Sequence, residues 1–168
     1  MGNVNKILIA IDDSEVSMKA VTYVAQMVRG RETTHIYLFH VLPPIPPKLL
    51  EFGGAEDPQK EQILSAELKA AQAEWIEKSK GAARLLIKRA QTILGDHGVP
   101  QNHISTHFSS SIHKPNVVRE VLEAAKQWHC GTVVVGRHRL PWVQELFHHH
   151  TGEELVEKGR EFSVWVVE

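Results

Sequence analysis

A basic loop follows one of the apolar runs in this chain, and its residue types suit the binding of an anion. Thr132–Val135 has the composition of a buried strand, and Gly136 ends it. Glycine lets the backbone turn sharply or approach a ligand closely. The candidate binding residues that come after it are the basic residues Arg137, Arg139, His149 and His150 and the hydroxyl-bearing Thr151. Guanidinium groups bind phosphate through paired hydrogen bonds, and a helix start favours negative charge. The pattern therefore predicts a cationic anion pocket.

Two of the candidate residues also have a structural interpretation. Thr151 and Glu154 form a capping box, and we favour that role for Thr151 over a phosphate contact. Asp12 and Asp13 directly follow the apolar run Ile7–Ile11. Asp12 either contacts a ligand or caps the helix that comes next, and the sequence does not separate these alternatives.

The apolar periodicity predicts strands alternating with helices. The predicted strands are Ile7–Ile11, His35–Leu42, His103–Ser109, Thr132–Val135 and Ser163–Val167. The predicted helices start near Glu15 after a Ser14 or Asp13 cap, at Asp57-Pro58, at Val117 after Asn116, and at Glu153. Such alternation indicates an α/β fold with a parallel sheet and helices on both faces. Ligands of these sheets bind beyond the carboxyl ends of the strands, where Asp12 and Gly136 both lie.

The segment at about 43–98 is the largest feature of the chain. Pro43–Pro47 is neither helix nor central strand. The helix after it would have about 38 residues and a length of roughly 57 Å. We expect a break or bend at Ser79–Gly81. The whole chain, residues 1–168, is predicted to be one domain carrying this extension.

Composition narrows the function classes. The net charge of −1 gives no support for nucleic-acid binding, and no apolar run is long enough to span a membrane. A single cysteine, Cys130, and an N-terminus without signal-peptide features predict a cytoplasmic protein. The 11 histidines make its charge pH-dependent. Three of them, His148–His150, are adjacent and would need a distant ligand to bind a metal, so we predict no metal site.

With these residues assembled, the chain resembles the universal stress protein family over essentially its full length. The resemblance is carried by Ile7–Ile11 with Asp12–Glu15, by His40-Val41, by Val133–Gly136 and by Val164–Val167. It implies an open, mainly parallel five-stranded sheet of the Rossmann-like type. It also implies a homodimer joined through the last strand, whose residues are Val164, Trp165, Val166 and Val167. In one branch of the family it implies ATP between the loops after strands one and four.

That branch has the motif Gly-x-x-Gly, nine residues, then Gly-Ser or Gly-Thr. Gly136 matches its first position, whereas Arg139, His149 and His150 stand where the later small residues belong. Asp12 matches the acid that contacts the nucleotide, with Asp13 in place of the usual glycine, and Val41 matches the position whose backbone meets adenine. The side chains of arginine and histidine crowd a phosphate cradle, but their charge attracts phosphate.

We therefore expect a regulatory or binding protein of the stress response, whose ligand is ATP or another adenine nucleotide, with Mg only if ATP binds. The alternative is a nucleotide-free dimeric scaffold that acts through protein contacts, and a weaker alternative is slow ATP hydrolysis. No nucleophile elbow, P-loop or zinc-protease motif occurs, so we expect no enzyme.

Overall fold

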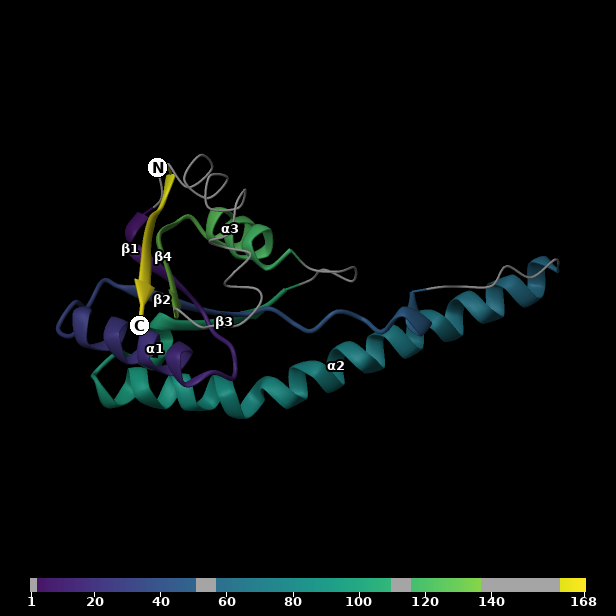
Figure 1. Ribbon diagram of the computed structural model, residues 1–168, viewed down its shortest axis with the longest axis horizontal. Coiled ribbons are helices and arrows are strands. Elements are labelled where there is room, and N and C mark those ends of the chain that lie inside the picture. The colour runs from purple at the N-terminus through teal and green to yellow at the C-terminus, as the bar shows by residue number, and fades with distance from the viewer. Residues whose placement is uncertain (1–2, 51–56, 110–115, 137–160) are drawn as a thin grey trace.

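The sheet is open and entirely parallel, with the strand order β3-β2-β1-β4-β5 (Figure 1). This computed structural model describes residues 3–50, 57–109, 116–136 and 161–168. The strands are β1 (Asn3–Ala10), β2 (His35–His40), β3 (Ile104–Phe108), β4 (Cys130–Gly136) and β5 (Ser163–Val167). The predicted fold class is confirmed. The strand order reverses direction between β1 and β4, and this is where an open α/β sheet forms its ligand crevice.

Helices cover both faces of the sheet. They are α1 (Glu15–Met27), α2 (Pro58–Asp96) and α3 (Val117–Gln127), with short 3-10 turns η1 (Pro47–Leu49) and η2 (Gln101–His103). α1 and α2 lie together on one face and α3 lies on the other (Figure 1). This arrangement follows from right-handed crossovers that move outward from β1 to β3 and then return to β4. The predicted helix from Glu153 lies outside the described residues.

Each of the three described α-helices begins at a side-chain cap. The Ser14 hydroxyl accepts a hydrogen bond from the Ser17 N–H at 3.1 Å, which identifies Ser14 rather than Asp13 as the cap of α1. Asp57, which precedes Pro58 at the start of α2, accepts a hydrogen bond from the Gln59 N–H through its carboxylate. The Asn116 side chain accepts one from the Arg119 N–H at the start of α3. These caps satisfy N–H groups that have no partner within the helix. The sequence therefore located all three helix starts.

α2 is longer than the sheet that it covers. Its buried residues, Ala83, Ile87, Ala90 and Leu94, all lie in its second half, and the first half extends away from the sheet (Figure 1). Of the predicted break or bend at Ser79–Gly81, the break does not occur, because the helix is continuous from Pro58 to Asp96. A single glycine inside a helix costs only about 1 kcal/mol, which the turns on either side of it can offset. Figure 1 shows that the helix bends instead.

The Pro-rich segment lies against the extended half of α2. η1 follows this segment, and the Gln72 side-chain amide donates to the Leu49 carbonyl oxygen at 2.6 Å. Ile45, within the proline run, is buried. Helix α2 is thus supported by the proline segment at a point that the sheet does not reach. None of the described helices is both long enough and apolar enough to cross a membrane.

Three strand boundaries differ from prediction by two residues or more. β1 starts at Asn3, with an irregular pairing between Asn3 and Ile7, and β4 starts already at Cys130. β2 ends at His40 rather than Leu42, because the Leu42 N–H donates to the Ser109 hydroxyl and leaves the strand ladder. β5 has the bounds that the sequence predicted.

Candidate functional site

A cavity of about 180 Å³ lies beyond the carboxyl ends of β1 and β2. Its lining consists of Ala10, Ile11, Asp12, Phe39, Val41, Leu42, Pro43, Pro44 and Val117. Asp12 is the charged residue of this lining, and the other side chains are apolar. An apolar hollow with a few placed polar groups is the usual composition of a small-molecule site. The predicted residues Asp12 and Val41, from separate strand ends, thus line one cavity.

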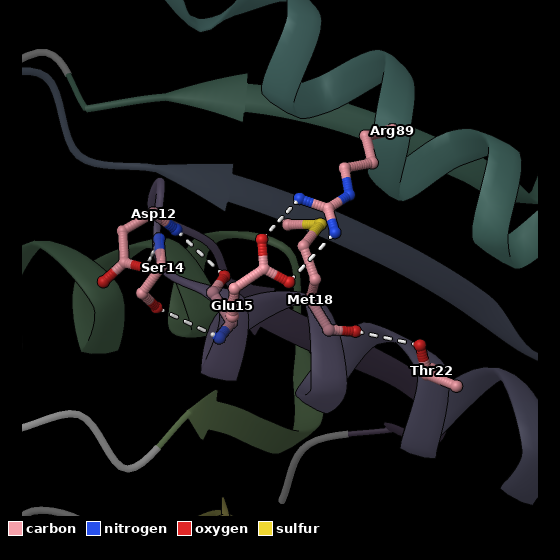
Figure 2. Close-up of polar contacts among 7 residues, drawn as sticks. Asp12, Ser14, Glu15, Met18, Thr22 and Arg89 are labelled. Atoms are coloured by element: carbon pink, nitrogen blue, oxygen red, sulfur yellow. Dashed lines mark hydrogen bonds and ion pairs between the residues drawn. The ribbon is translucent and has the colours of Figure 1, made fainter.

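Asp12 organises the turn between β1 and α1. Its Oδ1 accepts a hydrogen bond from the Ser14 N–H at 2.9 Å, and its own N–H donates to the Ser17 hydroxyl at 3.0 Å. Figure 2 shows the other carboxylate oxygen pointing away from α1. One oxygen therefore holds the turn that precedes α1, whereas the cap of the helix, one of the two roles predicted for Asp12, is supplied by Ser14. The role of the other oxygen in ligand binding stays a prediction.

The first turn of α1 is tied to α2 by an ion pair. The two terminal guanidinium nitrogens of Arg89, Nη1 and Nη2, each donate to one oxygen of the Glu15 carboxylate at 3.0 Å, in the paired arrangement shown in Figure 2. The hydrogen bond from Arg89 and then its charge hold the pKa of Glu15 below its usual value. Because both side chains are exposed, this pair orients the two helices more than it stabilises them.

Hydrogen bonds between strand ends hold Val41 in place. The Ile11 N–H donates to the Phe39 carbonyl oxygen at 2.8 Å, and Nδ1 of His40 donates to the Ile11 carbonyl oxygen at 2.9 Å. Ser109 donates its N–H to the His40 carbonyl oxygen, and its hydroxyl accepts from the Leu42 N–H. Sequence reasoning missed these roles of His40 and Ser109. The available signal was a serine placed directly after a predicted strand.

Gly136 is explained by packing against α1. A Cβ atom at this position would lie 2.8 Å from the Val16 carbonyl carbon and 2.9 Å from the Ser17 nitrogen. Only glycine allows the end of β4 to approach the first turn of α1 this closely. Gly136 does not belong to the cavity lining given above. Its presence therefore positions the start of α1, beside the turn that Asp12 forms.

The structure brings together only part of the predicted site. Asp13 is exposed next to Asp12 and does not line the cavity. The predicted phosphate-binding residues Arg137, Arg139, His149, His150 and Thr151, and the His148–His150 run, lie outside the described residues. Within the described ranges, His, Cys, Asp and Glu side chains form no group of three that could hold a metal ion.

The predicted dimer strand, β5, forms one edge of the sheet. It pairs with β4 on one side, and the ring of Trp165 packs edge-on against Tyr23 of α1 at 6.1 Å. Trp165 and Val167 face the α1 core, whereas Val164 and Val166 are 41% and 40% exposed on the other face. Within this chain Trp165 packs against α1, and its predicted part in a dimer stays a prediction. The apolar side chains left exposed at this edge are Val164 and Val166.

The comparisons with known proteins agree with this architecture. The model of the universal stress protein family matches residues 3–168, and the chain belongs to this family. A universal stress family protein from Burkholderia pseudomallei is similar in structure, with a TM-score of 0.57, 16% identity, and 97% of this chain and 95% of that chain covered. No match is found among functionally curated proteins.

Two further similar structures are complexes with adenine nucleotides. One is a universal stress protein in complex with cAMP, with a TM-score of 0.57, 14% identity, and 97% of this chain and 96% of that chain covered. The other is the universal stress protein from Archaeoglobus fulgidus in complex with dAMP, with a TM-score of 0.50, 15% identity and both chains fully covered. At these identities the likeness establishes the fold of the present chain.

Proposed function

We propose that this chain is a regulatory protein that binds an adenine nucleotide at the cavity beyond β1 and β2. The observation that carries the proposal is that Asp12 and Val41 line one apolar cavity beyond the carboxyl ends of β1 and β2. Complexes of structurally similar family members with cAMP and dAMP support the ligand class. ATP is one member of that class, and Mg would accompany it only if ATP is the ligand.

The described residues fit the nucleoside part of such a ligand. Apolar side chains of the cavity, such as Ala10 and Val117, would contact the faces of the base. The outward oxygen of Asp12 would accept a hydrogen bond from a ribose hydroxyl, while its other oxygen keeps the turn in place. The phosphates would be bound by the cationic residues that the sequence predicts for this role, Arg137, Arg139 and His150. In this proposal the nucleoside and the phosphates are therefore bound by separate parts of the chain.

Calorimetric titration of the full chain with adenosine, AMP and ATP tests the two parts separately. Adenosine binding would test the described cavity, and tighter binding of AMP or ATP would test the cationic loop. The ATP titration is repeated with and without Mg²⁺ to determine whether the metal contributes. Absence of binding of all three ligands at millimolar concentration would overturn the proposal.

Two substitutions locate the binding at the cavity. Asp12→Asn keeps an oxygen to accept from the Ser14 N–H but removes the charge, and we expect about tenfold weaker binding because hydrogen bonds to charged groups contribute more. Val117→Trp fills the cavity and should abolish binding. Glu123→Trp, on the exposed side of α3, is the size-matched control and should bind normally. Unchanged affinity in both cavity variants would place the ligand elsewhere.

A second candidate function is a dimeric scaffold that acts through protein contacts. It is favoured by the exposed Val164 and Val166 on an edge strand and by Ile63, which is 60% exposed on the extended half of α2. Edge strands with exposed apolar side chains are prone to pair with another chain. We propose a homodimer through β5. Light scattering at micromolar concentration should give twice the monomer mass for the wild-type chain. The Val166→Lys variant should give the mass of a single monomer. A monomeric wild-type chain would reject this interface.

A further inference from the structure

The α3 face of β2 and β3 carries a group of rings that has no part in the cavity. We call it the imidazole cluster, and it consists of Lys6, His35, Tyr37, His103, His107 and Trp128. Strand register gathers these residues, because Lys6 is opposite His35 and Phe39 is opposite His107. Side chains two positions apart on a strand share a face. Trp128 reaches the same face from the C-cap of α3.

The rings of the cluster are stacked on one another. Trp128 lies parallel to Tyr37, with centroids 5.4 Å apart, and its ring is 4.1 Å from that of His107. His35 lies 4.7 Å from Tyr37, and its Nε2 is 2.8 Å from the Ser105 hydroxyl. His107 therefore joins β3 to the end of α3, and His35 joins β2 to β3. These contacts hold an edge strand that has β2 as its strand partner in the described sheet.

The titratable groups that face His35 are all bases, and each of them in its protonated form would repel a proton on His35. They are His103 and His107 from the η2–β3 segment and Lys6 from β1, and with burial as the first cause they lower the pKa of His35. Burial also lowers the pKa of His107. Lys6 donates to the Trp128 carbonyl oxygen at 3.2 Å, and its ammonium group lies over the Tyr37 ring. Burial raises the pKa of nearby Cys130 to about 11, so this thiol supplies no negative charge at neutral pH.

The neighbouring elements offer little compensation. Lys126, in the last turn of α3, pairs with Glu161 at 3.6 Å. His129 is exposed after α3, and its backbone holds β1 by accepting from the Asn3 N–H. Nδ1 of His103 is buried without a hydrogen-bond partner among the described residues. A proton on His35 or His107 would therefore enter a group that already holds the ammonium group of Lys6.

We propose that the imidazole cluster is an acid-labile latch, which holds β3 against the end of α3 while its rings are neutral and releases this edge when they are protonated. The unfolded or locally opened chain binds protons with the ordinary histidine pKa of 6.5, while the closed cluster resists them. Opening is therefore favoured as pH falls below about 6.5. For each histidine that behaves in this way, the equilibrium constant for opening of the β3 edge rises by at most about tenfold for each pH unit that the pH is lowered.

Nuclear magnetic resonance on the wild-type chain tests the latch without any substitution. Imidazole signals of His35 and His107 should titrate below pH 6.5. Amide exchange, corrected for its intrinsic pH dependence, should show protection of β3 falling between pH 7 and pH 5 while the protection of the central strand β1 stays constant. Titration of both rings at or above 6.5, or equal loss of protection in both strands, would overturn the proposal.

A ring-preserving variant separates the latch from simple packing. His107→Phe keeps an aromatic ring against Trp128 but cannot take up a proton, so we expect β3 protection to depend less on pH, by up to about tenfold per pH unit. His129→Asn is the control, because His129 is exposed with φ 55° and asparagine tolerates that conformation. If His107→Phe is poorly folded, His35→Gln, which retains a polar partner for Ser105, replaces it. A wild-type pH dependence in the folded variant would contradict the latch.

Discussion

The two faces of the sheet are built from alternate residues of the same strands, yet they differ in chemistry. The face under α1 and α2 is largely aliphatic, with Ile9, Leu38 and Ile104 all buried, and it carries the rings of Phe108 and Trp165 at its two edges. The opposite face is aliphatic at β1 and β4 but changes to imidazole and phenol rings at β2 and β3. The difference follows from the covering helices. α2 extends over β3 on the first face, whereas in the described chain α3 reaches the β2–β3 side of the second face through Trp128.

Coverage thus determines how much polarity a sheet face tolerates. Side chains that a helix removes from water must be apolar or fully hydrogen-bonded. Rings at the half-covered edge can keep a polar atom, as the bond between His35 and Ser105 shows. We therefore expect the aliphatic face to determine the total stability of the fold, and the imidazole face to determine how that stability varies with pH.

The largest expected effect is a cavity in the aliphatic face. Leu38, a residue of β2, is fully buried under the helices α1 and α2. Leu38→Ala should lower the free energy of unfolding by about 2–5 kcal/mol, measured by denaturant titration. Leu64→Ala, on the extended half of α2, is the control and should change it far less. Similar losses from both substitutions would contradict the distinction between covered and uncovered surfaces.

A tighter contact on the same side of the molecule is that of Gly136 with the first turn of α1. Gly136→Ala places a methyl group 2.8 Å from backbone and should destabilise the fold by about 1–3 kcal/mol. Gly81→Ala is the matched control, because no atom lies within 4 Å of a Cβ there. It should stabilise helix α2 by about 0.5–1 kcal/mol. Thermal unfolding of the pair measures the contrast, and a harmless Gly136→Ala would contradict this account of the glycine.

The imidazole face should show its effect as pH is lowered. The lowered pKa values of His35 and His107 mean that the unfolded state binds more protons than the folded state below pH 6.5. The contribution of these two histidines to the free energy of unfolding should therefore be complete above about pH 6.5. It should be lost as pH drops through their pKa values in the folded state. The slope is at most about 1.4 kcal/mol per pH unit for each histidine. Denaturant titrations between pH 7.5 and pH 5 measure it, and a flat profile in this range would remove the contrast between the faces.

The smallest effect concerns the start of α1, where the candidate site meets the aliphatic face. Ser14→Ala removes the cap on the Ser17 N–H and should cost about 0.5–2 kcal/mol. Ser14→Asp keeps an acceptor oxygen and should restore most of the loss. Chemical denaturation of the two variants distinguishes capping from a general effect of substitution. Equal destabilisation by alanine and aspartate would contradict the capping role.

Local signals made the architecture predictable, whereas contacts between distant segments were not. The caps Ser14, Asp57 and Asn116 and the bounds of β5 follow from short-range chemistry that is legible in the sequence. Apolar and polar residues alternate along β3, and its polar side is the one that carries His107. That Trp128 would stack on this ring depends on where α3 ends above the sheet, which no local pattern specifies.

The candidate site was predictable to the same extent. The rule that parallel strand ends meet placed Asp12 beside Gly136, whereas the family resemblance supplied Val41, which lines one cavity with Asp12. The glycine at 136 was assigned to a phosphate cradle, but the described contacts explain it by the approach of α1. A required glycine indicates a close approach and does not identify the atoms that approach. The continuous α2 shows the same limit, since the strength of flanking turns outweighed one weak residue.

The extended half of α2 also affects how the molecule behaves in solution. A helix of 39 residues is about 58 Å long, whereas a compact chain of 168 residues has a radius of gyration of about 15 Å. The protein should therefore scatter X-rays and sediment as an elongated particle even as a single copy. Its apparent mass in gel filtration should exceed its true mass, so oligomeric state in this protein is best judged by methods that are independent of shape.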